Sequence, residues 1–229
     1  MGLGLALTGP SMWSVFIENF GLFFDCLLGT LKLAGISVGF GTLVGALVCL
    51  ARMSKNKVIY GLSTVYVEVL RGTPILAQLY IFAFVIPMIT DIEFFANEYN
   101  CVVIALIINS SAYVSEVFRS GIQSVDKGQT EAAKSLGMSD FNMMTRIVLP
   151  QAVKTILPSL ANEFIMMIKE TSLASTFFIT ELMYARTYLM STKFLTWQPI
   201  FIVAIIYFVI TFTLSKLVNV LEKRLAVSD

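Results

Sequence analysis

The side chains that could bind a charged group are concentrated in one otherwise apolar segment of the chain. Glu163, Lys169 and Glu170 are ionisable there, and Asn162 and Met166 accompany them. At helical spacing Asn162, Met166 and Lys169 share one face, and Glu163 and Glu170 share an adjacent face. Because an unpaired charge is costly inside a membrane, we expect these side chains either to pair with neighbouring helices or to line a path for a charged solute.

The composition offers little for covalent or metal chemistry. The chain has no His, and its three cysteines, Cys26, Cys49 and Cys101, are far apart and lie in or beside apolar segments. A membrane protease would need a Ser–Lys pair or paired carboxylates, for which no suitable spacing is present. No glycine-rich loop ends in Gly-Lys-Ser or Gly-Lys-Thr. We therefore expect a non-enzymatic chain that holds no cofactor or metal and has no ATP site of its own.

Two pairs of opposite charge stand three residues apart, a spacing that allows contact on a helix. They are Glu68 with Arg71 and Glu116 with Arg119, and we interpret both as structural ion pairs. A role for the first pair in lining a pathway stays open. The segment Arg71-Gly72-Thr73-Pro74 interrupts an apolar run, which predicts one long helix that is broken or kinked there.

A polar region at about 126–149 separates two apolar segments. Asp126 offers a helix start, Glu131–Leu136 are mostly good helix formers, and Gly137 supplies a left-handed stop. Ser139 can cap a second short helix. Helices of two or three turns are marginal alone in water, so we expect another surface to hold this pair of helices.

The overall composition is that of a polytopic membrane protein. Of its 229 residues 57% are hydrophobic and 14% are charged, and the mean hydropathy is +0.81. We predict a single all-α domain over 1–229, with five spans at about 22–53, 58–88, 101–121, 150–179 and 199–219. The net charge of +1, without a basic stripe, gives no reason to expect a nucleic acid partner.

The basic residues predict the orientation, because cytoplasmic loops of membrane proteins are enriched in Lys and Arg. The loop after the first span, the polar region with its flanks and the C-terminal tail together carry ten of the 16, so all three should be cytoplasmic: Arg52, Lys55, Lys57, Arg119, Lys127, Lys134, Arg146, Lys154, Lys223 and Arg224. The N-terminus, including the segment 1–13, is then outside and the C-terminus inside. Arg186 and Lys193 run against this pattern in the expected outer loop 181–198.

Several motifs resemble those of a known family. The residues Glu131-Ala132-Ala133, Gly137, Ile147, Leu149 and Pro150 resemble the EAA motif of membrane subunits of bacterial ABC importers. Further residues are similar to the polar amino acid permease branch, which includes histidine, glutamine and arginine permeases: Ala112-Tyr113, Glu116, Arg119, Gly121 and Lys169-Glu170-Thr171-Ser172-Leu173. Two positions depart from the family pattern, Ser120 in place of a glycine and Glu170 in place of Asp or Asn.

The resemblance implies a multi-pass subunit of the bacterial cytoplasmic (inner) membrane that takes up polar amino acids. Two partner ATPase subunits would bind ATP and Mg²⁺. A second permease, identical or homologous, and an extracellular or periplasmic binding protein would complete the importer. The small face of Ala132 and Ala133 would let the ATPase approach, and the coupling residues would be Gly128, Glu131, Ala132, Ala133, Leu136 and Gly137.

A free amino acid carries charges of both signs, as the segment around Glu163 does. If the substrate is cationic, Glu163 is the first choice for the residue that binds it.

The alternative function is a secondary transporter driven by an ion gradient. The charges of the fourth span fit that alternative, but the large polar region does not. A channel would need a filter or a ring of charges, and neither pattern is present.

Overall fold

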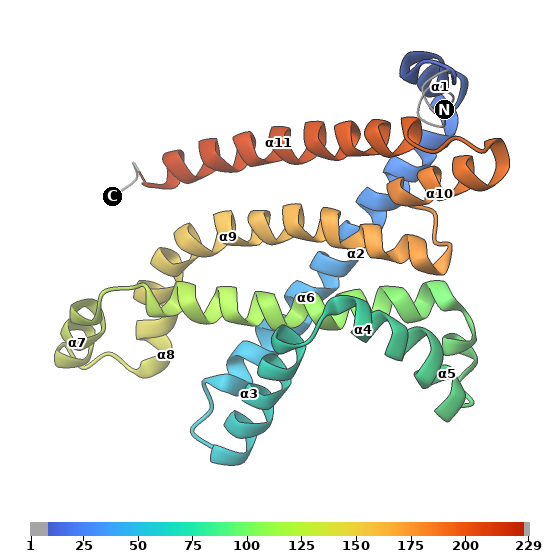
Figure 1. The fold of residues 1–229 in the computed structure, drawn as a ribbon. Helices are drawn as coiled ribbons and strands as arrows, with labels where there is room; N and C mark the ends of the chain where they lie inside the picture. The colour runs from blue at the N-terminus through green and yellow to red at the C-terminus, as the bar shows by residue number, and fades with distance from the viewer. Residues whose placement is uncertain (1–8, 227–229) are drawn as a thin grey trace.

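The computed structural model describes residues 9–226, and within them the chain is helical without a strand (Figure 1). The predicted all-α class is confirmed, while residues 1–8 of the expected outer N-terminal segment lie outside the described part. The α-helices are α1 (Met12–Glu18), α2 (Phe20–Arg52), α3 (Lys57–Gly72), α4 (Ile75–Tyr80), α5 (Ile86–Ile89), α6 (Glu98–Gln123), α7 (Lys127–Ser135), α8 (Asp140–Met143), α9 (Leu149–Glu170), α10 (Leu182–Lys193) and α11 (Gln198–Ala226). Short 3-10 helices are η3 (Glu93–Ala96) and η5 (Thr171–Phe177), and π-helical turns are η2 (Ile81–Val85) and η4 (Met144–Val148).

The bundle has two distinct ends. Helices α6, α9 and α11 run alongside one another, with α7 and α8 at one end and α10 at the other (Figure 1). Helix α2 crosses behind them, and its last residue, Arg52, bonds to Glu116 of α6 at the α7–α8 end. At the α10 end the Lys193 ammonium donates to Asn19 Oδ1 over 2.7 Å. We refer to these as the α7–α8 end and the α10 end.

Length and apolar composition alone identify fewer membrane spans than the five predicted. Among the described residues α2, α6 and α11 are long and apolar enough to cross a membrane, and α3 with α4–α5 adds one bent pair. Helix α9 is not among them, because Glu163, Lys169 and other polar residues interrupt its apolar character. The predicted fourth span also ends early, since its α-helix stops at Glu170 and η5 follows. The expected outer loop 181–198 is largely the helix α10, which is a second correction.

The predicted kink in the second segment is a sharp break of 106° between α3 and α4–α5. Thr73 and Pro74 are extended there. The buried Gln78 holds the break, because its amide nitrogen donates to the Leu70 carbonyl over 2.8 Å and to Thr73 Oγ1 over 2.9 Å. Its carbonyl oxygen accepts from Asn109 of α6 over 3.0 Å. The turn is thus fixed by a hydrogen-bonded network that reaches across the bundle.

Helices α2 and α6 approach closely through small residues. A Cβ on Gly41 would lie 2.7 Å from Ser110 Oγ, and one on Gly45 would lie 2.8 Å from the Ser111 carbonyl oxygen. Close contact through glycine and serine is the usual way in which helices associate where the surrounding solvent is lipid. Ser110 of this contact also donates to Glu163 of α9 over 3.5 Å.

The start of α10 is anchored by a fully buried carboxyl side chain, that of Glu181. Its two oxygens accept from the backbone amides of Tyr184 over 2.7 Å and Met183 over 2.9 Å. The Tyr207 hydroxyl of α11 donates to the same group over 2.8 Å, and Thr30 Oγ1 of α2 accepts from the Leu182 amide over 3.0 Å. Glu181 therefore joins α10 to two long helices.

We expect the thermal stability of the detergent-purified protein to fall as the pH rises, because of Glu181. Burial raises the pKa of its carboxyl from the ordinary 4.5 to about 7, so the folded state binds this proton more tightly than the unfolded state. Stability from the neutral form is then complete at low pH and is lost as the pH rises through about 7. Melting temperatures from about pH 5 to about pH 8 should show this slope in the wild type and a smaller one in Glu181→Gln. Equal slopes in the two proteins would contradict the assignment, and Glu93→Gln, an exposed acid, is the control.

Candidate functional site

The region between α6 and α9 forms two short helices set by local signals. Asp126 Oδ1 accepts from the Gly128 amide over 2.8 Å and caps α7. Gly137 follows with φ of +76°, which confirms the predicted left-handed residue. Ser139 Oγ accepts from the Asn142 amide over 3.3 Å and caps α8. The second helix is not a separate short helix as expected, because it continues through η4 into α9, so movement of α8 would pass directly to α9.

The inner face of this region packs on the chain itself. Ala133, Met143 and Val148 are buried together, with Ile122 and Val125 against them. Ala132 is exposed instead. The expectation that Ala132 and Ala133 form one free face is therefore wrong for Ala133, because adjacent residues of a helix point about 100° apart.

The outer face of the region presents large apolar side chains. Leu136 is 83% exposed and Phe141 is 75% exposed, one on each side of Gly137. Around them Glu131 and Lys134 are exposed as well. Exposed apolar side chains rimmed by charge mark interaction surfaces of proteins. Phe141 was not predicted as a site residue, although its position two residues after a helix cap is visible in the sequence.

A cluster of arginines surrounds one carboxylate near the same end. Glu116 accepts from Arg52 Nη1 over 2.7 Å and from Arg119 Nε over 3.1 Å, and a second Arg119 nitrogen, Nη2, lies against its other oxygen. Arg71 Nη1 is 3.9 Å from Glu116, and its guanidinium lies 5.4 Å from the centre of the Tyr113 ring. The structure thus brings Arg52 to a pair, Glu116 and Arg119, that was expected from their spacing.

The expected pair of Glu68 and Arg71 is not formed in the part of the chain that the structure describes. Arg71 lies nearest to Glu116, while Glu68 is exposed. The break that follows at Gly72 turns the end of α3 toward α6, which gives Arg71 a partner on another helix. A spacing of three residues allows contact but does not outweigh such a tertiary partner.

A cavity of about 260 Å³ opens where the α3–α4 break meets α6 and α9. It is lined by Thr73, Pro74, Ile75, Asn109, Tyr113, Glu163, Met166, Met167 and Glu170. Glu163 is partly buried, and one of its oxygens accepts from Ser110 Oγ over 3.5 Å. Two carboxylates, those of Glu163 and Glu170, line the cavity, and no Lys or Arg lines it. The neighbouring positive charge comes from Arg71, whose guanidinium is stacked on the lining Tyr113.

The five side chains proposed from the sequence as a substrate path are divided by the structure. Glu163, Met166 and Glu170 line this cavity together. Asn162 lines a different hollow, between α9 and the end of α11, and Lys169 is exposed on another side of α9. The polar residues of the cavity that the sequence did not indicate come from other elements: Thr73, Asn109 and Tyr113.

Comparison with known proteins agrees with this arrangement. Residues 37–227 match the family described as binding-protein-dependent transport system inner membrane component. A putative glutamine transport system permease protein, GlnP, of Rickettsia bellii is 39% identical over 87% of this chain and 90% of the relative. The nopaline transport system permease protein NocM of Agrobacterium fabrum is 38% identical over 90% of this chain and 88% of the relative.

Solved structures give the same result. The crystal structure of an amino acid ABC transporter with histidines contains a chain that is 40% identical to this one, with a TM-score of 0.88 over 95% of this chain and all of that chain. A chain of the MetNI methionine ABC transporter shares the fold at 13% identity, with a TM-score of 0.75. The chain therefore belongs to the family of inner membrane components of binding-protein-dependent transport systems, and it is a permease subunit of an amino acid ABC importer.

Proposed function

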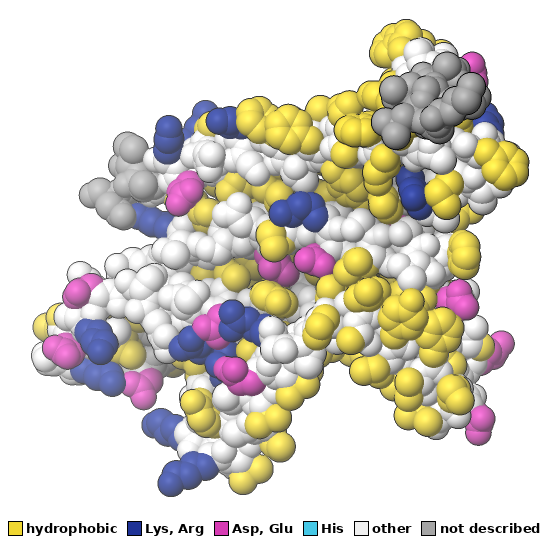
Figure 2. All heavy atoms as spheres, in the orientation of Figure 1, with side chains coloured by type: hydrophobic (Ala, Val, Ile, Leu, Met, Phe, Trp, Pro, Cys, Tyr) yellow, Lys and Arg dark blue, Asp and Glu magenta, His cyan; other side chains and the backbone are white. Residues whose placement is uncertain are grey.

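We propose that the chain crosses the bacterial cytoplasmic (inner) membrane five times, with the α7–α8 end in the cytoplasm and the α10 end outside. The support is the distribution of positive charge, since most Lys and Arg side chains on the face in Figure 2 lie toward the α7–α8 end. That end carries Arg52, Lys55, Lys57, Arg119, Lys127, Lys134, Arg146, Lys154, Lys223 and Arg224, against Lys32, Arg186 and Lys193 at the other. In this arrangement α9 is the fourth span, and its polar side faces the inside of the importer.

The outer face of the α7–α8 region is the proposed docking surface for an ATPase subunit. Leu136 and Phe141 would enter an apolar cleft, and exposed Glu131 and Lys134 would form the polar rim. Gly128 and Ala132 lie on the same helix, where small side chains leave room for the partner. Two ATPase subunits would bind ATP and Mg²⁺, and their closure would move α9 through the continuous connection of α8, η4 and α9.

The cavity between α6 and α9 is the proposed substrate site, and the observation that carries this proposal is its pair of carboxylates. Glu163 and Glu170 would hold positively charged groups of a polar amino acid, and Arg71, beside Tyr113, would attract its carboxylate. Relatives are named for glutamine, nopaline and octopine transport. Two facing carboxylates favour a cationic amino acid, because one α-ammonium group leaves the second carboxylate without a partner.

Competition for uptake tests this choice of substrate. The complete importer, with its ATPase, a second permease and its binding protein, is reconstituted in vesicles loaded with ATP, and uptake of labelled arginine is measured. We expect unlabelled lysine and arginine to compete far better than glutamate. Collapse of ion gradients should leave uptake intact and vanadate should stop it. Equal competition by glutamate would contradict a cation-selective cavity.

A further inference from the structure

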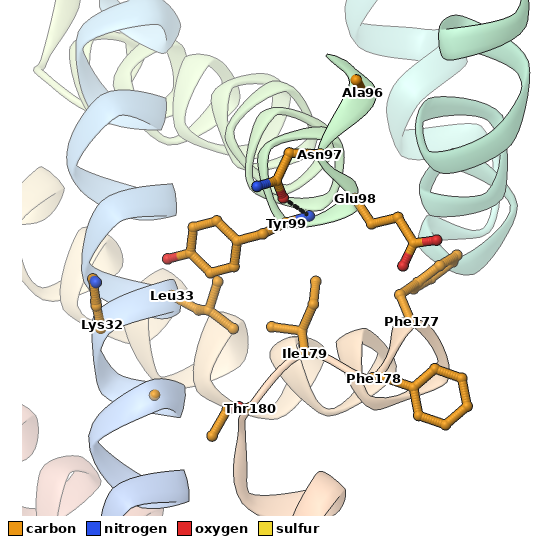
Figure 3. A pocket seen from close by; sticks show the side chains of 11 residues that line it. Lys32, Leu33, Ala96, Asn97, Glu98, Tyr99, Phe177, Phe178, Ile179 and Thr180 are labelled. Atoms are coloured by element: carbon orange, nitrogen blue, oxygen red, sulfur yellow. Dashed lines mark hydrogen bonds between the residues drawn. The ribbon is translucent and has the colours of Figure 1, made fainter. Parts of the chain in front are cut away.

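A second cavity lies at the α10 end, away from the proposed substrate site. Its volume is about 670 Å³. Three separate elements form its walls, as Figure 3 shows: α2, the start of α6 with η3, and the turn between η5 and α10. The residues that line it are Gly29, Lys32, Leu33, Ala96, Asn97, Glu98, Tyr99, Phe177, Phe178, Ile179 and Thr180. Neither the sequence motifs nor the transport mechanism uses this cavity.

Charges of opposite sign lie on the two sides of the cavity. Lys32 and Glu98 lie on opposite sides in Figure 3, and neither forms an ion pair within the described part of the chain. The Tyr99 hydroxyl is buried without a hydrogen-bond partner there, and in Figure 3 it points toward α2 on the side of Lys32. A buried hydroxyl that lacks a partner is costly, so a ligand oxygen at this position would satisfy it.

The depth of the cavity matches the outer headgroup region. Lys32 lies about 30 Å along α2 from Arg52, and Glu98 lies about 27 Å along α6 from Glu116, at about 1.5 Å per residue. Arg52 and Glu116 are bonded at the α7–α8 end. The hydrocarbon core of a bilayer is about 30 Å thick. Measured along each helix, Lys32 and Glu98 therefore stand about one hydrocarbon thickness from Arg52 and Glu116, which in the proposed orientation is the level of the outer headgroups.

The floor of the cavity is apolar. Leu33, Phe177 and Ile179 are buried at its base, while Phe178 is 73% exposed at its rim. We propose that this cavity binds a zwitterion, with an ammonium group against Glu98 and an oxyanion against Lys32 and the Tyr99 hydroxyl. Two sources carry this chemistry, the headgroup of an outer-leaflet phosphatidylethanolamine and a free amino acid on its way to the permease. The inference goes beyond the substrate site and does not depend on it, while the outer-leaflet source rests on the proposed orientation.

The test uses the full-length chain purified in detergent and native mass spectrometry with three lipids of one acyl composition. We expect phosphatidylethanolamine to be retained about tenfold more than phosphatidylcholine, whose methylated ammonium cannot donate to Glu98. Glu98→Gln should abolish that preference, and Lys32→Gln should weaken the binding of phosphatidylethanolamine and phosphatidylglycerol alike. Glu93→Gln, an exposed acid in the neighbouring η3, is the matched control and should behave as wild type.

The second arm titrates the same variants with arginine and glutamine by calorimetry. If the source is a free amino acid, the three lipids bind equally, while amino acid binding persists in Glu163→Gln and is lost in Glu98→Gln. Either pattern supports the zwitterion site. Binding of both probes by Glu98→Gln and Lys32→Gln at wild-type strength, with unchanged elution of the purified proteins, would overturn it.

Discussion

Substitution of Glu163 by Gln is expected to reduce uptake by the reconstituted importer roughly thirtyfold or more, the size of effect seen when one partner of a buried charge pair is removed. Glu163 is partly buried at the wall of the cavity between α6 and α9, where its carboxylate accepts from Ser110 Oγ. No Lys or Arg lines this cavity, so a bound substrate would supply the positive charge. Gln has the same shape but lacks the negative charge, so a substrate ammonium loses its counter-ion. The measurement is initial uptake of labelled arginine across a range of concentrations.

Two comparisons separate this effect from misfolding. Glu170→Gln should weaken uptake in the same direction, because Glu170 lines the same cavity. Glu93→Gln removes an exposed acid far from the cavity and should leave uptake unchanged. ATP hydrolysis without substrate should be similar in all variants. Full uptake by Glu163→Gln, with an unaltered Michaelis constant, would show that the substrate does not contact this carboxylate.

Gly137→Val is expected to leave the protein inserted and assembled but to lower uptake per ATP hydrolysed by about tenfold. Gly137 has φ of +76° between α7 and α8, a conformation that costs a side-chain-bearing residue about 1–2 kcal/mol and a β-branched residue more. Relief of that strain would change the angle between the helices and thus the separation of Leu136 from Phe141. The two rates, uptake and hydrolysis, are measured on the same vesicles.

The matched variant is Gly137→Asn, because Asn adopts left-handed conformations more readily than other residues with a side chain. A Cβ at Gly137 meets no atom within 4 Å, so packing does not distinguish the two variants and backbone conformation does. We expect Asn to retain most of the coupling. Equal uptake per ATP in Val and wild type would refute the role of Gly137.

The local features of the α7–α8 region could be predicted because they depend on neighbouring residues in the sequence. Asp126, Gly137 and Ser139 act within three or four positions, so their residue types are enough to place two helix starts and one stop. Which side of α7 would be free could not be predicted. Ala133 is buried because α8 and η4 fold back on α7, where Met143 and Val148 pack against it, and that contact depends on how the two helices are placed.

Features that depend on distant partners escaped prediction. The bond from Arg52 to Glu116 joins two helices that are far apart in the sequence, and the same carboxylate, rather than Glu68, is the one nearest to Arg71. The residues around Pro74 indicated a break, but its angle is set by Gln78 and its bond to Asn109. Conversely, Asn162 and Lys169 share a helix with Glu163 and yet face other surroundings.

Helix α10 was expected to be a loop for a physical reason. Its N-cap is Glu181, a residue that is uncommon in that position, and its C-terminal residue in the left-handed region is Phe194, with φ of 54°, where glycine is usual. The helix is stabilised instead by tertiary contacts, which are the bond of Tyr207 to the buried Glu181 and the packing of Leu182 and Leu189. Tertiary contacts thus replace the local signals by which helices are recognised.

The central claim is that the α7–α8 region lies in the cytoplasm and contacts an ATPase subunit. The three cysteines, Cys26, Cys49 and Cys101, are all buried, so a new exposed cysteine is the preferred target for labelling and crosslinking. Leu136 and Phe194 are matched positions, since they are 83% and 84% exposed at opposite ends of the bundle. Their Cys variants differ chiefly in the side of the membrane that each is proposed to face.

The decisive measurement is thiol crosslinking of these two variants in the assembled importer, together with labelling by an impermeant maleimide in right-side-out and inside-out vesicles that contain the permease without the ATPase subunit. We predict that Leu136→Cys crosslinks to the ATPase subunit and is labelled by the maleimide only in inside-out vesicles. Phe194→Cys should not crosslink to the ATPase and should be labelled only in right-side-out vesicles. Labelling of Leu136→Cys from the outside, or crosslinking of Phe194→Cys in its place, would contradict the proposed orientation and the proposed coupling together.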